Sequence, residues 1–262
     1  MPSFAAGVVD MSPEMEKNLY YFVSDVHLGL DYKDPVGRER KFASFLKGLP
    51  SGTKAVYLLG DIFDFWYEYR NVVPRNYTRT LGALAELVDR GVEVYFFNGN
   101  HDIWTYGYFE KELGIKVLQQ PYVVELEGKR FCLGHGDGLG EGDFGYKLLN
   151  WGFKNRFLQW LFSGLHPRWA FGLAHLWSRH NRLMHEDNPW EWRGEDERIV
   201  KFANSFQTGR TEKVDYFIFG HFHYKTHINL SAGGEMFLLG DWIHNPGYLV
   251  FDGYTCQSPN IE

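Results

Sequence analysis

Short apolar runs that end in a glycine and a potential metal ligand constrain the fold of this chain more than any other feature. Four such runs end in Gly60-Asp61, Gly99-Asn100, Gly134-His135 and Gly220-His221, and the first apolar run ends in Ser24-Asp25-Val26-His27. In α/β sheets, ligands gather beyond the carboxyl ends of the strands, and glycine allows the backbone to turn tightly at that edge. The motifs therefore predict five strands whose ends direct polar side chains toward one place.

The spacing of the apolar residues predicts a mixed α/β fold. Runs typical of buried strands lie at residues 20–24, 55–59, 92–97, 130–133, 216–219, 236–239 and 248–251. Helical spacing occurs at residues 38–49 and 77–90, and again in an amphipathic stretch that ends near Gly209. Alternating strands and helices followed by a strand-rich second half are typical of an α/β sandwich.

The segment from Phe144 to His185 differs in composition from the rest of the chain. Its apolar residues recur at helical spacing, which predicts a helical cap insert at about residues 143–190. It contains no Asp or Glu, whereas its Lys and Arg residues are Lys147, Lys154, Arg156, Arg168, Arg179 and Arg182. The insert and its edge also hold the tryptophans Trp151, Trp160, Trp169, Trp177, Trp190 and Trp192. Basic and aromatic residues together favour a surface that meets acyl chains and anionic headgroups.

Two other interpretations of these aromatic residues stay open. The aromatic side chains can pin a helical cap to the sandwich, which is the simpler interpretation of any single residue because buried aromatic faces are common. Basic and aromatic residues can also hold single-stranded nucleic acid. The formal net charge of −6 gives the chain no general attraction for nucleic acid, so we expect no nucleic-acid partner.

The chain termini and cysteines bear on organisation and location. Residues 1–18 are polar and irregular, which predicts a flexible N-terminal tail before a single domain at residues 19–262. Cys132 and Cys256 are too few for a disulfide framework, which favours a reducing compartment. No stretch reaches the roughly 18 uncharged apolar residues of a membrane span. We therefore expect a cytoplasmic protein.

The residue types in the five motifs indicate a metal centre. Carboxylate, imidazole and amide oxygen ligands suit manganese, iron, zinc or magnesium. Two such ions that share a bridging carboxylate can orient a phosphoryl group and lower the pKa of water, as hydrolysis of a phosphate ester or anhydride requires. A lone Asp or His after a strand is usually structural, but five coincident motifs outweigh that interpretation.

In this order, the motifs Asp-x-His, Gly-Asp-x-x-Asp, Gly-Asn-His-Asp, Gly-His and Gly-His-x-His resemble the calcineurin-like metallophosphoesterase family. The resemblance implies a four-layer αββα sandwich that holds two divalent ions, with Mn²⁺ favoured and Fe, Zn or Mg compatible. It assigns one ion to Asp25, His27, Asp61 and His223. It assigns the other ion to Asp61, Asn100, His135 and His221, so that Asp61 bridges the two.

The same resemblance implies roles for two residues beside the metal ligands. His101 is expected to donate a proton or a hydrogen bond to the phosphate or to the leaving oxygen. The carboxylate of Asp64 is expected to orient His101 from outside the ligand shell. An equally acceptable interpretation of Asp64 is a charge at the N-terminus of a helix.

A narrower resemblance extends over residues 21–253. The stretches at 59–66, 135–146 and 220–223 are similar to those of the UDP-2,3-diacylglucosamine hydrolases, the pyrophosphatases of bacterial lipid A biosynthesis. This resemblance implies cleavage of the lipid-linked nucleotide sugar to a lipid monophosphate and UMP, at the inner surface of the cytoplasmic membrane. It also implies that the cap receives the acyl chains. The implied substrate contacts are Asn100, His101, Asp143 and Tyr146, although a helix N-cap and its packing partner explain Asp143 and Tyr146 equally well.

Two departures from the hydrolase pattern leave alternative functions open. That family commonly has Gly-Asn-Arg-Asp where this chain has His101, and it often has Glu at the position of Asp64. One alternative is a metallophosphoesterase that acts on another phosphodiester or on a nucleotide. A second alternative is a non-catalytic scaffold of the same fold, against which the complete set of seven ligands argues.

Overall fold

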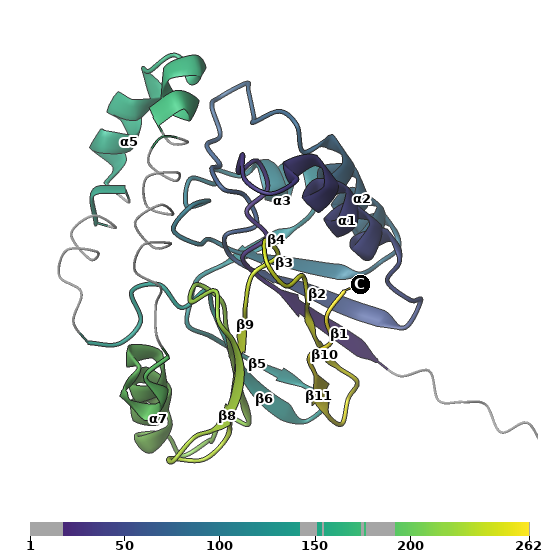
Figure 1. Cartoon of the computed structure of the whole chain (residues 1–262), viewed down its shortest axis with the longest axis vertical. Coiled ribbons are helices and arrows are strands. Elements are labelled where there is room, and N and C mark those ends of the chain that lie inside the picture. Colours follow the sequence, from purple (N-terminus) through teal and green to yellow (C-terminus); the bar gives the residue numbers. More distant parts are fainter. Residues whose placement is uncertain (1–17, 142–150, 154, 174–175, 177–191, 262) are drawn as a thin grey trace, which may run out of the picture.

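A computed structural model describes residues 18–141, 151–153, 155–173, 176 and 192–261 (Figure 1). Its strands form two sheets, one with the order β11-β10-β1-β2-β3-β4 and the other with the order β5-β6-β7-β9-β8. The first sheet consists of β1 (Leu19–Val23), β2 (Thr53–Leu59), β3 (Glu93–Phe97), β4 (Lys116–Leu118), β10 (Leu249–Phe251) and β11 (Cys256–Gln257). The second consists of β5 (Tyr122–Leu126), β6 (Lys129–Leu133), β7 (Tyr216–Phe219), β8 (Lys225–Asn229) and β9 (Glu235–Leu239).

Helices α1 (Pro35–Lys47), α2 (Thr78–Asp89) and α3 (Tyr108–Leu113) cover the outer face of the first sheet. Successive side chains of a strand point to opposite faces, so Tyr21 and Val23 pack toward these helices while Phe22 packs toward the second sheet. The start of α1 follows from its sequence: the carboxylate of Asp34 accepts the Gly37 N–H at 2.9 Å, and proline occupies the first helical position.

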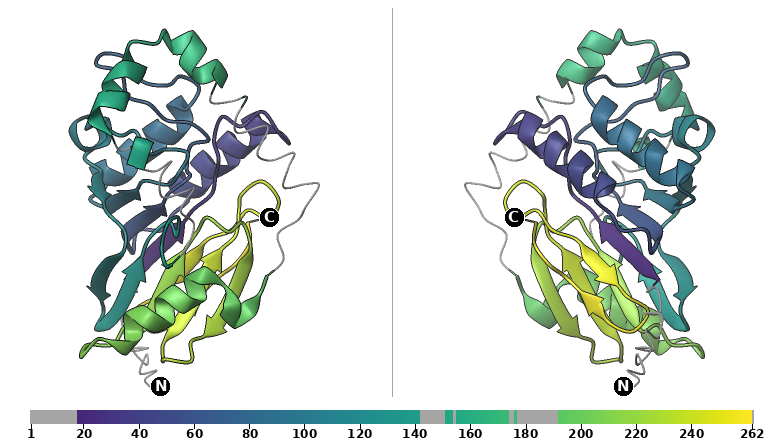
Figure 2. Two further views of the ribbon diagram at one scale, coloured as in Figure 1. Left: turned by 90° about the vertical axis from the view of Figure 1, so that its left-hand side faces the viewer. Right: turned by 90° about the vertical axis from the view of Figure 1, so that its right-hand side faces the viewer.

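Helix α7 (Arg198–Thr208) covers the outer face of the second sheet, as Figure 2 shows from the side. Its residues Ile199, Val200 and Ala203 pack in one cluster with Phe217 of β7 and Met236 of β9. A separate apolar cluster fills the space between the two sheets. The layers are therefore helix, sheet, sheet and helix, and the predicted four-layer αββα sandwich is confirmed.

All seven predicted strands are present, with boundaries within two residues of those expected from the sequence. Strands β4, β5, β8 and β11 and the short helix α3 were not predicted from the sequence. The missed strands are short or partly exposed edge strands, and β8 has the polar sequence Lys-Thr-His-Ile-Asn. A strand with little buried surface leaves only a weak apolar signal in the sequence.

The described part of the predicted cap insert is helical at residues 151–153, in α5 (Arg156–Ser163) and at residues 167–173. Phe153, Phe162 and Phe171 pack against a small cluster formed by Phe65, Tyr67 and Trp104. By contrast, the exposed fractions of the tryptophans are 63% for Trp151, 68% for Trp160 and 69% for Trp169. The interpretation that tryptophans pin the cap is thus wrong for these three, because phenylalanines make that contact.

Several predictions concern residues outside the described part of the chain. These are the flexible tail at residues 1–18, apart from Asn18, and the substrate contacts Asp143 and Tyr146, as well as Trp177 and Trp190. Within the described residues, no helix combines the length and the apolar character needed to cross a membrane.

Candidate metal centre

The structure brings the seven predicted metal ligands together at one edge of both sheets. Asp25 and His27 follow β1, Asp61 follows β2 and Asn100 follows β3. His135 follows β6, and His221 and His223 follow β7 of the second sheet. Strands β1, β2 and β3 are mutually parallel, as are β6 and β7, so their carboxyl ends deliver these side chains side by side.

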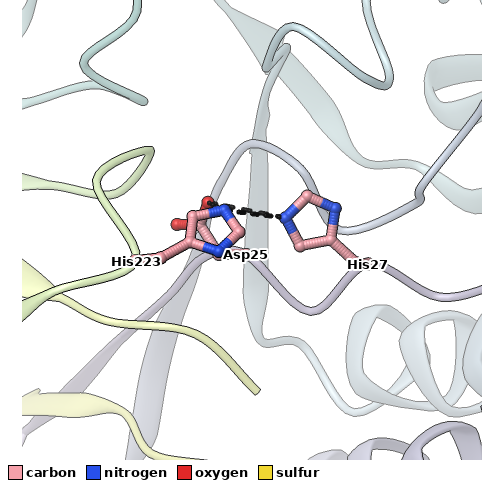
Figure 3. A group of neighbouring side chains, drawn as sticks. All are labelled: Asp25, His27 and His223. Carbon is pink, nitrogen blue, oxygen red and sulfur yellow. Dashed lines mark hydrogen bonds and ion pairs between the residues drawn. The ribbon is translucent and has the colours of Figure 1, made fainter. Parts of the chain in front are cut away.

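Asp25, His27 and His223 form one group of ligand atoms (Figure 3). The Oδ1 atom of Asp25 lies 3.4 Å from Nε2 of His223 and 3.8 Å from Nε2 of His27. The two Nε2 atoms are 3.2 Å apart. Two ligands bound tetrahedrally to one metal ion at ordinary bond lengths are about 3.4 Å apart, so this triangle has the dimensions of a metal site.

Asp61, Asn100, His135 and His221 form the second group. Nε2 of His135 lies 3.3 Å from Oδ2 of Asp61 and 3.3 Å from Oδ1 of Asn100. The same Asn100 oxygen is 3.0 Å from Nδ1 of His221. Oδ2 of Asp61 is also 3.8 Å from Nε2 of His27, so Asp61 lies between the two groups.

The chemistry of the first group fits a bound cation. Within the described residues, Oδ1 of Asp25 is buried and accepts no hydrogen bond. Asp25 and His27 are fully buried, and a buried carboxylate without compensation is costly. His135 donates Nδ1–H to the carbonyl of Leu59 at 2.9 Å, which leaves Nε2 as the ligand atom in the second group.

Five of the seven candidate ligands have a left-handed backbone conformation. Their φ angles are 52° for Asp25, 49° for His27, 51° for Asp61, 70° for His221 and 52° for His223. Such conformations cost on the order of 1–3 kcal/mol each for residues other than glycine, and they cluster at functional sites. The strain at these strand ends directs the side chains to the common centre.

Three of the motif glycines are needed because a side chain at their position would collide with a candidate metal ligand. A Cβ atom at Gly60 would lie 2.7 Å from the ring of His135. A Cβ atom at Gly99 would collide with the carboxylate of Asp61, and one at Gly220 would collide with that of Asp25. Only Gly60 among these three has a positive φ, at 83°. At Gly99 and Gly220, the absent side chain leaves room for a ligand from a neighbouring strand.

Burial and neighbouring charges shift the pKa values of the candidate ligands. Burial alone would raise the pKa of Asp25, but the neighbouring imidazoles of His27, His135 and His223 lower it to about 2. Burial likewise opposes ionisation of Asp61, yet the charge of His135 holds its pKa well below the usual range. Burial and the charge of His135 lower the pKa of His221. Asp25 and Asp61 are therefore held in the ionised form in which a carboxylate binds a metal ion.

Comparison with known proteins identifies the family. The calcineurin-like phosphoesterase family model matches residues 20–225. The chain belongs to this family. The match spans β1 to the start of β8 and includes all seven candidate ligands.

Relatives of this calcineurin-like phosphoesterase match it over most of its length. A UDP-2,3-diacylglucosamine hydrolase from Porphyromonas gingivalis is 40% identical over 92% of this chain and 97% of its own. A protein of the same name from Neisseria meningitidis is 31% identical over 86% of this chain and 90% of its own. Among solved structures, a dimetal phosphatase from Danio rerio is 16% identical over 92% of this chain and 98% of its own, with a TM-score of 0.47.

His101 of this phosphoesterase lies beside the first group of ligands. Its side chain is 22% exposed, and its ring stands edge-on to that of His27 with centroids 4.9 Å apart. Nδ1 of His101 donates to the backbone carbonyl of Asp64 at 2.9 Å, whereas the Asp64 carboxylate is 3.7 Å away. The carboxylate is closer to Nδ1 of His27, at 3.4 Å. Asp64 thus contacts His101 through its backbone carbonyl, and its carboxylate lies nearer to His27 than to His101.

The alternative interpretation of Asp64 as a helix N-terminal charge is wrong. Residues 61–70 contain no helix, and Asp64 is 2% exposed. The residues that follow β2 instead form an irregular loop that carries Asp64 toward His27 and His101.

Asp102, the last residue of the Gly-Asn-His-Asp motif, has a role that was not predicted from the sequence. Its Oδ2 accepts the N–H groups of Ile62 at 2.8 Å and Phe63 at 3.2 Å. Its Oδ1 accepts those of Gly99 at 2.8 Å and Asp61 at 3.2 Å. Burial and the charge of Asp61 raise the pKa of Asp102 to about 7. This carboxyl group fixes the turn that presents Asp61, and the position of Asp102 within a motif was the signal for it.

Proposed function

We propose that this phosphoesterase hydrolyses the diphosphate of UDP-2,3-diacylglucosamine to a lipid monophosphate and UMP. The observation that carries the proposal is the pair of ligand groups joined at Asp61, which fits two divalent ions. The two hydrolases that are 40% and 31% identical to the chain support the choice of substrate. Mn²⁺ is the favoured metal, and Fe, Zn and Mg are compatible with oxygen and imidazole ligands.

In this proposal, Asp25, His27, Asp61 and His223 hold one ion, and Asp61, Asn100, His135 and His221 hold the other. Two bound divalent ions neutralise diphosphate oxygens and lower the pKa of water. His101 donates Nδ1–H to the Asp64 carbonyl, so its Nε2 is the nitrogen that meets the substrate. As an imidazolium, His101 can donate a proton from Nε2 to the leaving oxygen. Asn100 and His101 then contact the diphosphate, and we assign further substrate contacts to Asp143 and Tyr146.

The cap is proposed to receive the acyl chains. A cleft of about 1000 Å³ lies between α5, the loop at residues 67–73 and the start of α3 at residues 106–112. Aromatic side chains line much of it, namely Tyr67, Tyr69, Tyr106, Tyr108 and Trp160. The same walls hold three basic residues, Arg70, Lys111 and Arg156, and two acidic ones, Glu68 and Glu112. An apolar cleft with a few charged groups is typical of a site for an amphipathic ligand.

The exposed face of the cap is proposed to rest on the inner surface of the cytoplasmic membrane. Trp151, Trp160 and Trp169 are each more than 60% exposed, and the described cap residues also expose Phe157, Leu161, Leu173 and Leu176. The insert contains no acidic residue between Phe144 and His185. Exposed aromatic and aliphatic side chains accompanied by Arg and Lys favour binding to a bilayer with anionic lipids.

The test compares substrates with the purified protein reconstituted with Mn²⁺. We expect the protein to release UMP from UDP-2,3-diacylglucosamine. Its kcat/KM for this substrate should be well above that for a soluble phosphodiester such as bis-p-nitrophenyl phosphate. Rapid turnover of the soluble phosphodiester without any UMP would instead favour a phosphoesterase for another substrate. Binding of fewer than two metal equivalents, with neither activity, would favour the non-catalytic scaffold.

A further inference from the structure

Asp241 is a buried carboxylate at the edge where the metal ligands meet, and none of the family motifs includes it. It follows β9 after Gly240, and β9 pairs in parallel with β7, the strand that leads to His221 and His223. The side chain of Asp241 is 5% exposed. The next residue, Trp242, donates its backbone N–H to the carbonyl of Asp25 at 3.0 Å. The loop after β9 is therefore attached directly to the first ligand group.

The backbone of this loop fixes the orientation of the Asp241 carboxylate. Oδ1 accepts the N–H groups of Ile243 at 2.8 Å and His244 at 2.7 Å. The other oxygen, Oδ2, lies 3.7 Å from Nδ1 of His223. The same Oδ2 lies 3.0 Å from Nδ1 of His244, whose side chain is 50% exposed.

The two ring nitrogens of His223 face different partners. Nε2 lies 3.4 Å from Oδ1 of Asp25 and 3.2 Å from Nε2 of His27, within the first ligand group. Nδ1 faces the Asp241 carboxylate. A carboxylate beside the second nitrogen of a metal-binding histidine holds the tautomer and ring orientation that the metal requires. The His223 side chain is 34% exposed, whereas those of Asp25 and His27 are fully buried, so its ring depends most on such support.

We propose that Asp241 is a positioning residue that acts through His223 on one of the two metal ions. The proposal rests on the proposed function, because His223 is a ligand only if the first group binds an ion. It assigns Asp241 two separate contacts: Oδ1 shapes the loop, and Oδ2 holds His223. The competing interpretation is that Asp241 only stabilises the loop, through its contacts with the loop backbone and with His244.

Asp241→Asn separates these two interpretations. An asparagine keeps a carbonyl oxygen for the N–H groups of Ile243 and His244, but its amide group cannot accept a proton from Nδ1 of His223. His244→Gln removes the exposed imidazole and leaves the proposed contact to His223 intact. Asp215→Asn is the matched control, because Asp215 also accepts a backbone N–H, that of Arg130 at 2.8 Å, but has no contact with the described ligands.

The readouts are Co²⁺ or Mn²⁺ binding by calorimetry and the visible absorption spectrum of the Co²⁺ protein. Asp241→Asn is expected to weaken the binding of one ion roughly 10- to 100-fold and to change the spectrum of that site alone. His244→Gln and Asp215→Asn are expected to match the wild type. In a His223→Ala background, Asp241→Asn is expected to have no further effect on the remaining ion. This double-variant comparison tests the coupling through His223 even if Asp241→Asn lowers the melting temperature.

The inference is overturned if Asp241→Asn binds both ions with wild-type affinity and spectrum. It is also overturned if His244→Gln reproduces the loss, or if Asp241→Asn weakens metal binding equally in the His223→Ala background. A wild-type protein that binds fewer than two ions would contradict the proposed function instead. The stoichiometry of the wild type therefore distinguishes the two failures.

Discussion

Gly220 lies so close to the carboxylate of Asp25 that a methyl group at its Cα would collide with Oδ2. Gly220→Ala is therefore expected to displace Asp25 from the first ligand group. Because misplacement of a reacting group by about 1 Å can cost roughly 100-fold in rate, we expect at least that loss in kcat/KM, with weaker metal binding.

The matched control for this substitution is Gly82→Ala in α2, where an added Cβ has no neighbour within 4 Å. Alanine is a better helix former than glycine, so this variant is expected to keep full activity and gain roughly 0.5–1 kcal/mol in free energy of unfolding. Steady-state kinetics and thermal melts of both variants provide the measurement. Full activity in Gly220→Ala would contradict the packing described here.

His101 is expected to act on the substrate without contributing to metal binding. His101→Asn removes the imidazole, and we expect kcat to fall roughly 10²- to 10⁴-fold, as for loss of a general acid. Two ions should still bind with wild-type affinity, because His101 belongs to neither proposed ligand set. Metal stoichiometry and turnover are measured on the same sample. If this variant bound only one ion, His101 would instead be a metal ligand.

Asp102 is expected to contribute to stability through the turn that presents Asp61. Asp102→Ala leaves the buried N–H groups of Ile62, Phe63 and Gly99 without their acceptor, and each such group costs about 1–3 kcal/mol. We therefore expect a loss of about 3 kcal/mol or more in free energy of unfolding, measured by urea denaturation. Asp196→Ala is the control, because the Asp196 side chain is 81% exposed and pairs only with exposed Lys201 among the described residues. Equal stability of the two variants would refute this role.

The motifs at the strand ends made the seven candidate ligands and the sandwich predictable from sequence. Each motif is local, and apolar runs that end in polar residues reveal both the strand and its functional end. The roles of Asp102 and Asp241 depend on contacts between distant segments. Asp102 binds backbone groups about 40 residues earlier in the chain, and Asp241 faces a histidine of a neighbouring strand. Asp102 at least belongs to a motif, but Asp241 belongs to none, and such an aspartate gives no sign of its partner in the sequence.

The sequence also could not distinguish aromatic residues that pin the cap from those that it exposes. Phe153 and Trp151 lie two residues apart at the start of the described cap, yet Phe153 packs on the Trp104 cluster and Trp151 is 63% exposed. Helical spacing identifies faces of a helix, but which face meets the sandwich depends on the tertiary structure. The tertiary structure therefore shows which of these aromatic residues packs on the sandwich and which is exposed.

The exposed tryptophans of the cap are expected to control membrane binding. Replacing Trp160 and Trp169 with glutamine removes apolar area that would enter a bilayer, so binding to vesicles with anionic phospholipid should fall at least roughly tenfold. Sedimentation with the vesicles provides the measurement, and added salt should weaken binding further. Tyr254→Gln is the control, because Tyr254 is 65% exposed on the loop between β10 and β11. Unchanged binding by the double tryptophan variant would exclude the cap as the docking surface.

The most direct test of the two-metal account is UMP release from UDP-2,3-diacylglucosamine by the wild type and by Asp61→Ala, each supplied with Mn²⁺. Asp61 lies between both ligand groups, 3.3 Å from His135 Nε2 and 3.8 Å from His27 Nε2. Loss of a residue that only orients a metal ligand typically costs up to about 100-fold in activity. Because Asp61 is proposed to bind both ions directly, we expect Asp61→Ala to lower turnover by more than that. We expect the wild type to release UMP and the variant to release almost none. Full activity in Asp61→Ala would contradict it.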